Sequence, residues 1–161
     1  MTLQTAVLQI AATVSELLDA SISPAAQSSP VQHTQFNEQL RFTPSTTVPI
    51  DTLVAYATTI AGGGYTIDLT AAQGTQETVD LTGKKVRAIL INNTSNANAV
   101  TVDVGGANPY VLNGGDPIVV PAGGDALFYF ANGLAAVSGT VKNLAVTGTD
   151  GQAPQIMILA G

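Results

Sequence analysis

The sequence predicts an all-β fold, an antiparallel two-sheet sandwich of jelly-roll type, and three observations lead to this prediction. The 161 residues include 20 Thr and 16 Val, which are β-branched and fit the pleated surface of a strand. Several segments alternate apolar and polar residues with a period of two. Clusters of Gly, Asn and Pro separate these segments at short intervals, as turns do in sandwiches, and no long helical pattern lies between them.

The strands follow from these patterns in chain order. Tyr65, Ile67 and Leu69 alternate with polar neighbours, and Val100, Val102 and Val104 do the same. Apolar residues on both faces predict a central strand over Val86–Ile91, and Ala126–Phe130 shows the same two-sided pattern. Further strands are expected at Thr52–Ile60, Ile118–Val120, Leu144–Thr147 and Ile156–Leu159.

The first fifty residues are less regular. Over residues 3–18, a helix would place Val7, Ile10 and Val14 on one face, whereas a strand would place Leu8 with Ile10 and Val14. The β-rich surroundings favour the strand. Residues 20–30 are rich in Pro and Ser and predict an extended N-terminal arm, and residues 43–49 predict a second link. We expect one domain over residues 1–161, with residues 1–50 fitting it less well.

Composition excludes several classes of protein. The absence of cysteine removes disulfides, thiolate metal sites and cysteine nucleophiles. Charged residues make up 10% of the chain, with 5 basic and 11 acidic side chains, so the net charge of −6 argues against a nucleic-acid binder. No run of 18 apolar residues predicts a membrane span. The first twenty residues have no positively charged side chain and carry Glu16 and Asp19, so they are not expected to act as a secretory signal.

The residues that could carry chemistry do not form a recognisable site. His33 is the only histidine, and it lies in a polar run beside the predicted arm. The acidic residues are scattered, and Asp116, Asp125 and Asp150 lie in Gly-rich turns, where Asp is a common turn former as well as a conceivable calcium ligand. We therefore predict no enzyme activity, no catalytic or metal-binding residues and no cofactor.

Two features are candidate contact sites. Lys84, Lys85 and Arg87 form the one basic cluster, which fits either a polar contact with a partner or a solvated strand end. Tyr110, in the sequence Asn108-Pro109-Tyr110, is the best candidate for an exposed aromatic side chain that could contact a glycan. The alternative for Tyr110 is an ordinary place in the core or at its rim.

The C-terminal half resembles small β-sandwich structural proteins of tailed phages and prophages. The resemblance is carried by four segments: the strand and Asn-rich loop Thr82–Asn93, the Val strand ending in Gly-Gly at 100–107, the Pro-Gly-Gly turn at 120–128 and the closing strand Ile156–Leu159. It covers about residues 64–161, and its motifs are turn motifs. The resemblance implies a virion component with a jelly-roll-like sandwich and transfers no catalytic residues.

These expectations lead to a function. We expect a virion structural protein that decorates or cements a capsid shell, lies on the particle surface and is made in the host cytoplasm. Its partners would be further copies of itself, with a trimer favoured, and the major capsid protein or another virion protein. Neither nucleic acid nor a membrane is an expected partner. The alternative is a tail, neck or fibre component, or a glycan-binding or receptor-binding adhesin module.

Overall fold

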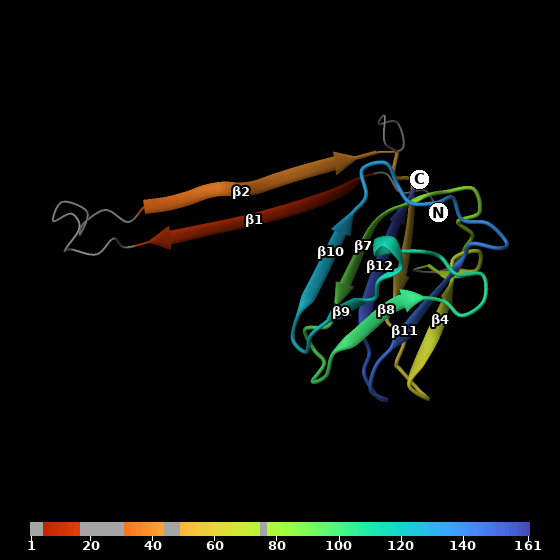
Figure 1. The fold of residues 1–161 in the computed structure, drawn as a ribbon. Helices are drawn as coiled ribbons and strands as arrows, with labels where there is room; N and C mark the ends of the chain where they lie inside the picture. The colour runs from red at the N-terminus through yellow and green to blue at the C-terminus, as the bar shows by residue number, and fades with distance from the viewer. Residues whose placement is uncertain (1–4, 17–30, 44–48, 75–76) are drawn as a thin grey trace. The chain divides into compact units, whose positions relative to one another are not determined.

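The computed structural model describes residues 5–16, 31–43, 49–74 and 77–161. These residues form two compact units: a hairpin unit, Thr5–Phe42, and a sandwich unit that comprises Thr43–Gly161. Figure 1 shows the strands of both units in chain order. The sequence predicts one domain over residues 1–161, whereas the structure separates the hairpin from the sandwich.

The hairpin unit contains two long antiparallel strands, β1 (Ala6–Glu16) and β2 (Val31–Phe42). Ala6 lies opposite Phe42 and Glu16 lies opposite Val31, with one register shift between Ala12 and Val14. The strand alternative for residues 3–18 is therefore correct, and the helix alternative is wrong. The predicted arm over residues 20–30 lies outside the described residues.

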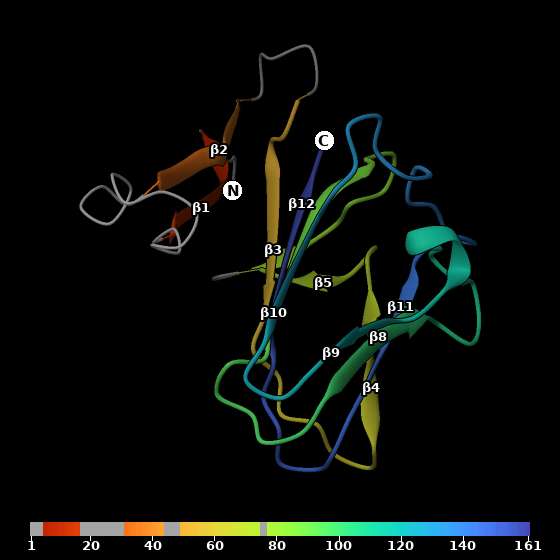
Figure 2. The ribbon, with the colours of Figure 1, turned by 60° about the vertical axis from the view of Figure 1, so that its left-hand side comes forward.

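The sandwich unit is built from two four-stranded antiparallel sheets, which confirms the predicted all-β, two-sheet fold (Figure 2). The first sheet contains, in spatial order, β10 (Asp125–Tyr129), β7 (Val86–Asn92), β12 (Gln155–Ala160) and β3 (Thr52–Tyr56). The second sheet contains β4 (Gly64–Asp68), β11 (Asn143–Thr147), β8 (Val100–Val104) and β9 (Ile118–Val120). A short hairpin of β5 (Ala72–Gln73) and β6 (Thr78–Val79) and a single 3-10 turn at Asn113–Gly115 complete the described elements.

Strand pairing in the sandwich is nested. In chain order, the outermost strands β3 and β12 pair with each other, as do β4 with β11, β7 with β10, and β8 with β9. Two further pairs, β12 with β7 and β11 with β8, join these hairpin-like units into the two sheets. Except for β8 and β9, which are neighbours in the second sheet, consecutive strands among these eight lie in different sheets.

The core lies between the two sheets, where alternate residues of each strand meet. Ile89, Ile156 and Ile158 of the first sheet and Leu144 and Val146 of the second are essentially inaccessible to solvent and belong to one apolar cluster. Full burial of side chains of this size stabilises the fold by about 1.5–3 kcal/mol each. The apolar residues at alternate positions of the strands are therefore the residues that form this core.

Most predicted strands are found close to their expected bounds. Strand β9 matches the prediction at both ends, and β7 is a central strand between β10 and β12, as its two apolar faces predict. The predicted strand over Thr52–Ile60 is shorter in the structure and ends at Tyr56, whose pair with Ile156 is the last between β3 and β12. Ile60 is still buried, and its N–H donates to the carbonyl of Gln152 outside the sheet.

Gly105 allows β8 and β11 to come close together, and we expect Gly105→Ala to destabilise the sandwich. A Cβ at this position would lie 2.5 Å from Cβ and 2.7 Å from the carbonyl oxygen of Asn143. Overpacking of this kind costs about 1–3 kcal/mol. Gly106→Ala is the matched control, because a Cβ there meets no atom within 4 Å. Thermal denaturation of both variants checks this, and an equal loss of stability in the two would contradict it.

Candidate interaction surface

The two outer faces of the sandwich differ in polarity. On the second sheet, the register aligns Ala145 with Thr66 on one side and Asp103 on the other, and Thr147 with Thr101. Short polar residues dominate this face, as they do on a solvated sheet surface. The largest apolar exception is Val119 of the edge strand β9, which is 59% exposed.

On the outer face of the first sheet, a third row that contains Asp125, Asn92 and Gln155 is polar, but the rest is apolar. Pairing aligns one residue from each strand into two rows that cross the sheet, and neither row contains a charged side chain. The rows are Leu127, Leu90, Met157 and Ala55, and Tyr129, Ala88, Leu159 and Leu53. We call these eight residues the apolar face.

Part of the apolar face is open to solvent. Met157, at its centre, is 39% exposed, and Leu90 and Leu127 beside it are partly exposed. Ala88 and Leu159 in the second row are buried. A contiguous apolar patch on a sheet surface usually marks a contact with a partner, because leaving it in water is unfavourable. This asymmetry between the two outer faces is the strongest functional signal among the described residues.

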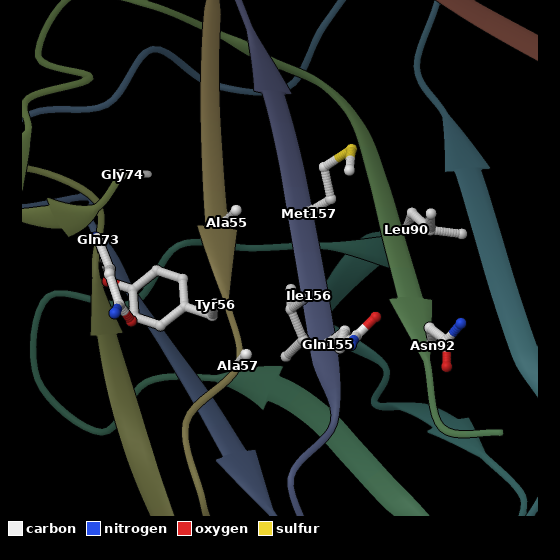
Figure 3. A pocket seen from close by; sticks show the side chains of 10 residues that line it. All are labelled: Ala55, Tyr56, Ala57, Gln73, Gly74, Leu90, Asn92, Gln155, Ile156 and Met157. Carbon is white, nitrogen blue, oxygen red and sulfur yellow. Dashed lines mark hydrogen bonds between the residues drawn. The ribbon is translucent and has the colours of Figure 1, made fainter. Parts of the chain in front are cut away.

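A shallow pocket of about 360 Å³ lies on the first sheet and overlaps one row of the apolar face (Figure 3). Its floor contains Ala55, Met157 and Leu90, from three neighbouring strands. Its rim contains amide side chains, and none of its ten lining residues is charged. The rim residues include Gln73 of β5, Asn92 of β7 and Gln155 of β12. The pocket can therefore contact apolar and neutral polar groups.

Tyr56 anchors one side of this pocket. Its hydroxyl accepts a hydrogen bond from the N–H of Gln73 at 2.9 Å, which ties β5 to the first sheet. The ring stacks on Tyr65, with centroids 6.4 Å apart and planes inclined by 17°. Burial, with a smaller contribution from Tyr56, raises the pKa of Tyr65 to about 12, and burial also raises the pKa of Tyr56. Both hydroxyls stay protonated at neutral pH, and the two rings pack against each other.

The predicted basic cluster does not present three free cations. Lys84 Nζ lies 2.6 Å from Asp51 Oδ1, and Arg87 Nη1 donates to the carbonyl of Ala131 at 3.3 Å. Burial alone would raise the pKa of Asp51, but hydrogen bonds from Lys84 and Thr52 outweigh it and lower that pKa. Of the cluster, Lys85 has an exposed side chain. Lys84 and Arg87 therefore have internal structural roles.

Tyr110 is fully buried, so the interpretation of this residue as an exposed glycan contact is wrong and the core alternative is correct. Its hydroxyl donates to the carbonyl of Ala135 at 2.6 Å and accepts from the N–H of Val86 at 3.2 Å. The N–H of Tyr110 donates to the carbonyl of Asn143 at the start of β11. Tyr110 thus connects the start of β7 to two loops.

Among the described residues, no three His, Cys, Asp or Glu side chains gather as metal ligands would. Asp150 acts as a turn residue, since its Oδ1 accepts from the N–H of Gly63 at 2.7 Å. His33 lies in β2 opposite Val14. No helix in the described part of the chain is long and apolar enough to cross a membrane.

One surface ion pair predicts a modest dependence of stability on pH. Lys142 Nζ lies 2.6 Å from Asp68 Oδ2, and Thr70 donates twice to the other carboxylate oxygen. Burial would raise the pKa of Asp68, but these hydrogen bonds outweigh it and lower the pKa. The stabilisation is therefore present above the unfolded pKa of about 3.9 and disappears as the pH falls through the lower, folded value.

We expect Lys142→Met to lower the free energy of unfolding by at most about 1 kcal/mol at pH 7, since the pair is half-exposed and screened. The difference from wild type should shrink as the pH falls below the unfolded pKa and vanish once the carboxylate of the folded protein is protonated. Lys85→Met, which removes an exposed lysine, is the control and should change little at any pH. Denaturant titrations across this pH range check the expectation, and a difference independent of pH would contradict it.

Comparisons with known proteins do not place the chain in a family. Neither a scan against protein-family models nor searches of curated proteins and of solved structures finds a match.

Proposed function

We propose that this chain is a non-enzymatic structural subunit of a phage virion that decorates or cements the capsid shell as a homo-oligomer. The observation that carries the proposal is the contrast between the two outer faces of the sandwich. The second sheet presents short polar residues, whereas the first presents two uncharged rows across all four strands. A subunit that buries one face against neighbours and leaves the other in water has this distribution of polarity.

The edges of the first sheet also favour an assembled state. Its edge strands are β3 and β10, and of their ten residues one, Asp125, is charged. Monomeric proteins commonly protect such edges with lysine, proline or a covering segment. Unpaired edge strands and an exposed apolar face both promote non-specific association. Packing against symmetric copies of the same chain would bury both.

The strand order supports the connection to virion proteins. The nested pairing of β3 with β12, β4 with β11, β7 with β10 and β8 with β9 supports the proposal of a jelly roll. Jelly rolls occur widely among viral capsid domains, although the fold alone does not define a function. The resemblance of residues 64–161 to small phage sandwich proteins is consistent with this order.

The net charge of the chain is compatible with binding to a capsid shell. The net charge of −6 keeps free subunits soluble and complements a basic surface on a major capsid protein. Stabilisation would arise from many modest contacts repeated over the shell lattice, with a trimer as the favoured unit.

The test is to delete the gene, purify the particles and heat them. Cemented shells should release their DNA at a lower temperature when the protein is missing, and adding the purified protein back should restore the original temperature. Particles that retain DNA to the same temperature but lose attachment to host cells would contradict the cement role.

The pocket on the first sheet favours the second candidate, a tail or adhesin module that binds a neutral glycan. Amide side chains and an apolar floor suit the hydroxyl groups and apolar faces of sugars, and Gln73, Asn92 and Gln155 supply the amides. Gln155→Ala should then abolish glycan binding on an array while leaving the temperature of DNA release unchanged. Loss of heat resistance without any glycan binding would exclude this candidate.

A further inference from the structure

Two Asn-Gly pairs, Asn113-Gly114 and Asn132-Gly133, lie outside the strands of the sandwich unit. An asparagine before a glycine readily loses its side-chain amide, because the next peptide nitrogen can attack the amide carbon and glycine has no Cβ to hinder the approach. This attack requires a free N–H on the glycine, room for the peptide to rotate and access of water. The two pairs differ in the first two of these requirements.

The N–H of Gly133 already has an acceptor. It donates to the carbonyl of Phe130 at 2.8 Å, so an attack by this nitrogen must first break a hydrogen bond. The position is also tightly packed, since a Cβ on Gly133 would lie 2.8 Å from Nη1 of Arg87 and 2.9 Å from Cβ of Lys85. The fold therefore holds the peptide between Asn132 and Gly133 in place.

The N–H of Gly114 has neither constraint. Within the described part of the chain it donates no hydrogen bond, whereas the next two N–H groups of the turn do: Gly115 donates to the carbonyl of Leu112 at 2.7 Å and Asp116 to that of Asn113 at 3.3 Å. A Cβ at Gly114 would meet no atom within 4 Å. Both Asn113 and Gly114 are exposed on the surface of the sandwich unit. The amide of Asn113 and the nitrogen of Gly114 can therefore approach each other in water.

We propose that Asn113 is a site of spontaneous deamidation in the folded protein and that the fold protects Asn132. The nitrogen of Gly114 gives its proton to solvent and forms a bond to Cγ of Asn113, while the side-chain nitrogen takes up a proton and leaves as ammonia. Water then opens the resulting succinimide ring at either of its carbonyl groups. Opening at one carbonyl gives aspartate in the original main chain. Opening at the other gives isoaspartate, in which the main chain runs through the former side chain.

Either product changes the turn that precedes β9. Each adds one negative charge, which takes the net charge of the chain from −6 to −7. In isoaspartate, the carbonyl oxygen of Asn113 that accepts from the N–H of Asp116 becomes part of a carboxylate outside the main chain. The main chain is also longer by one carbon atom between Leu112 and Gly115, whose hydrogen bond closes the turn. Aged molecules therefore differ from newly made ones in charge and in the conformation of this turn.

Both asparagines can be followed in one peptide, because trypsin releases residues 88–142 as a single fragment without an internal Lys or Arg. Full-length protein is kept at neutral pH in water enriched in the heavy oxygen isotope. Samples are taken at intervals and digested in ordinary water, and fragment masses locate each deamidated residue. Ring opening incorporates one heavy oxygen atom, which distinguishes the reaction from aspartate formed before the incubation. A parallel incubation in guanidinium chloride removes the fold.

In the folded protein we expect Asn113 to react roughly two- to tenfold faster than Asn132, the factor that corresponds to the net strength of the hydrogen bond that Gly133 must break. In guanidinium chloride the two should react at similar rates, since both are followed by glycine. Asn113→Gly, which suits the positive φ of 42° at this position, should remove the fast reaction. Asn132→Gly is the matched control and should leave the fast reaction unchanged.

Equal rates at the two asparagines of the folded protein would overturn the assignment, as would a faster reaction at Asn132. Reaction at Asn113 only in guanidinium chloride would show that the fold protects this turn as well. The modification does not depend on what the chain assembles with. A failed deamidation test therefore leaves the proposed cement role untouched, and an unchanged temperature of DNA release would leave the modification site untouched.

Discussion

Asn93→Asp should be the most damaging isosteric change in the sandwich, with a loss of about 3–5 kcal/mol at pH 7, as expected for an uncompensated buried charge. Asn93 is fully buried at the end of β7. Its Nδ2 lies within hydrogen-bond distance of three carbonyl oxygens: Asn98 at 2.9 Å, Pro121 at 2.9 Å and Val120 at 3.3 Å. A carboxylate in this position would turn an attractive donor into a negative charge facing three acceptors.

The dependence of this loss on pH has a definite sign. Burial and the facing carbonyls raise the pKa of an aspartic acid at position 93 in the folded state above its unfolded value of about 3.9. The protonated acid can donate one hydrogen bond, so the difference from wild type should be smallest below pH 4 and grow as the pH rises. Urea titrations of variant and wild type at each pH measure this difference.

Asn92→Asp is the matched control for this prediction. The Oδ1 of Asn92 accepts from the N–H and hydroxyl of Thr94, so a carboxylate at position 92 can accept the same two hydrogen bonds. The new carboxylate lies opposite Asp125 in the register, so its effect on stability should be a loss of at most about 1 kcal/mol. Equal losses in the two variants would show that the carbonyls do not depend on the Asn93 amide.

Tyr110→Ala should cost about 3–5 kcal/mol, the range for removing a large aromatic side chain from a core. Tyr110 is the largest of the fully buried side chains, and its burial raises the pKa of the phenol. Tyr110→Phe keeps the ring but leaves the N–H of Val86 and the carbonyl of Ala135 without this partner. Unsatisfied buried groups of this kind cost about 1–3 kcal/mol.

Tyr56→Phe provides the comparison for Tyr110→Phe. The hydroxyl of Tyr56 accepts a single, exposed hydrogen bond from Gln73, which water can replace, so the loss should be below about 1 kcal/mol. Chemical denaturation of Tyr110→Ala, Tyr110→Phe and Tyr56→Phe measures the loss in free energy of unfolding for each variant. A loss for Tyr110→Phe no greater than for Tyr56→Phe would contradict the structural role assigned to the buried hydroxyl.

The strands of the sandwich could be predicted because their residues carry a local signal. Alternation marks β4 and β8, and two apolar faces mark the central strand β7. Strand β2 was missed, since its sequence VQHTQFNEQLRF mixes polar and apolar residues without strict alternation. For β1, helical and strand periodicities coexist, and the antiparallel pairing with β2 decides between them.

The candidate surface could be predicted only in part. The apolar outer residues of β7 were visible in the sequence, but the face exists because pairing aligns Leu127, Leu90 and Met157 from three strands far apart in the chain. For Tyr110, the sequence predicts exposure, whereas the structure shows a buried side chain. The turn sequence Asn108-Pro109-Tyr110 indicates local exposure, and no local pattern reveals that its N–H bonds to Asn143 and draws the ring into the core. The structural role of Asn93 could not be predicted either, because no local pattern in the Asn-rich loop reveals the carbonyl groups that its amide contacts.

The number of copies of this chain in each purified particle tests the central claim most directly. Quantitative mass spectrometry against isotope-labelled peptides of this chain and of the major capsid protein supplies that number. A subunit that cements the shell through its apolar face should be present in hundreds of copies, in a fixed ratio to the major capsid protein. A few copies to a few tens per particle, or no copies at all, would contradict the cement role, and the former result would favour the tail or adhesin alternative.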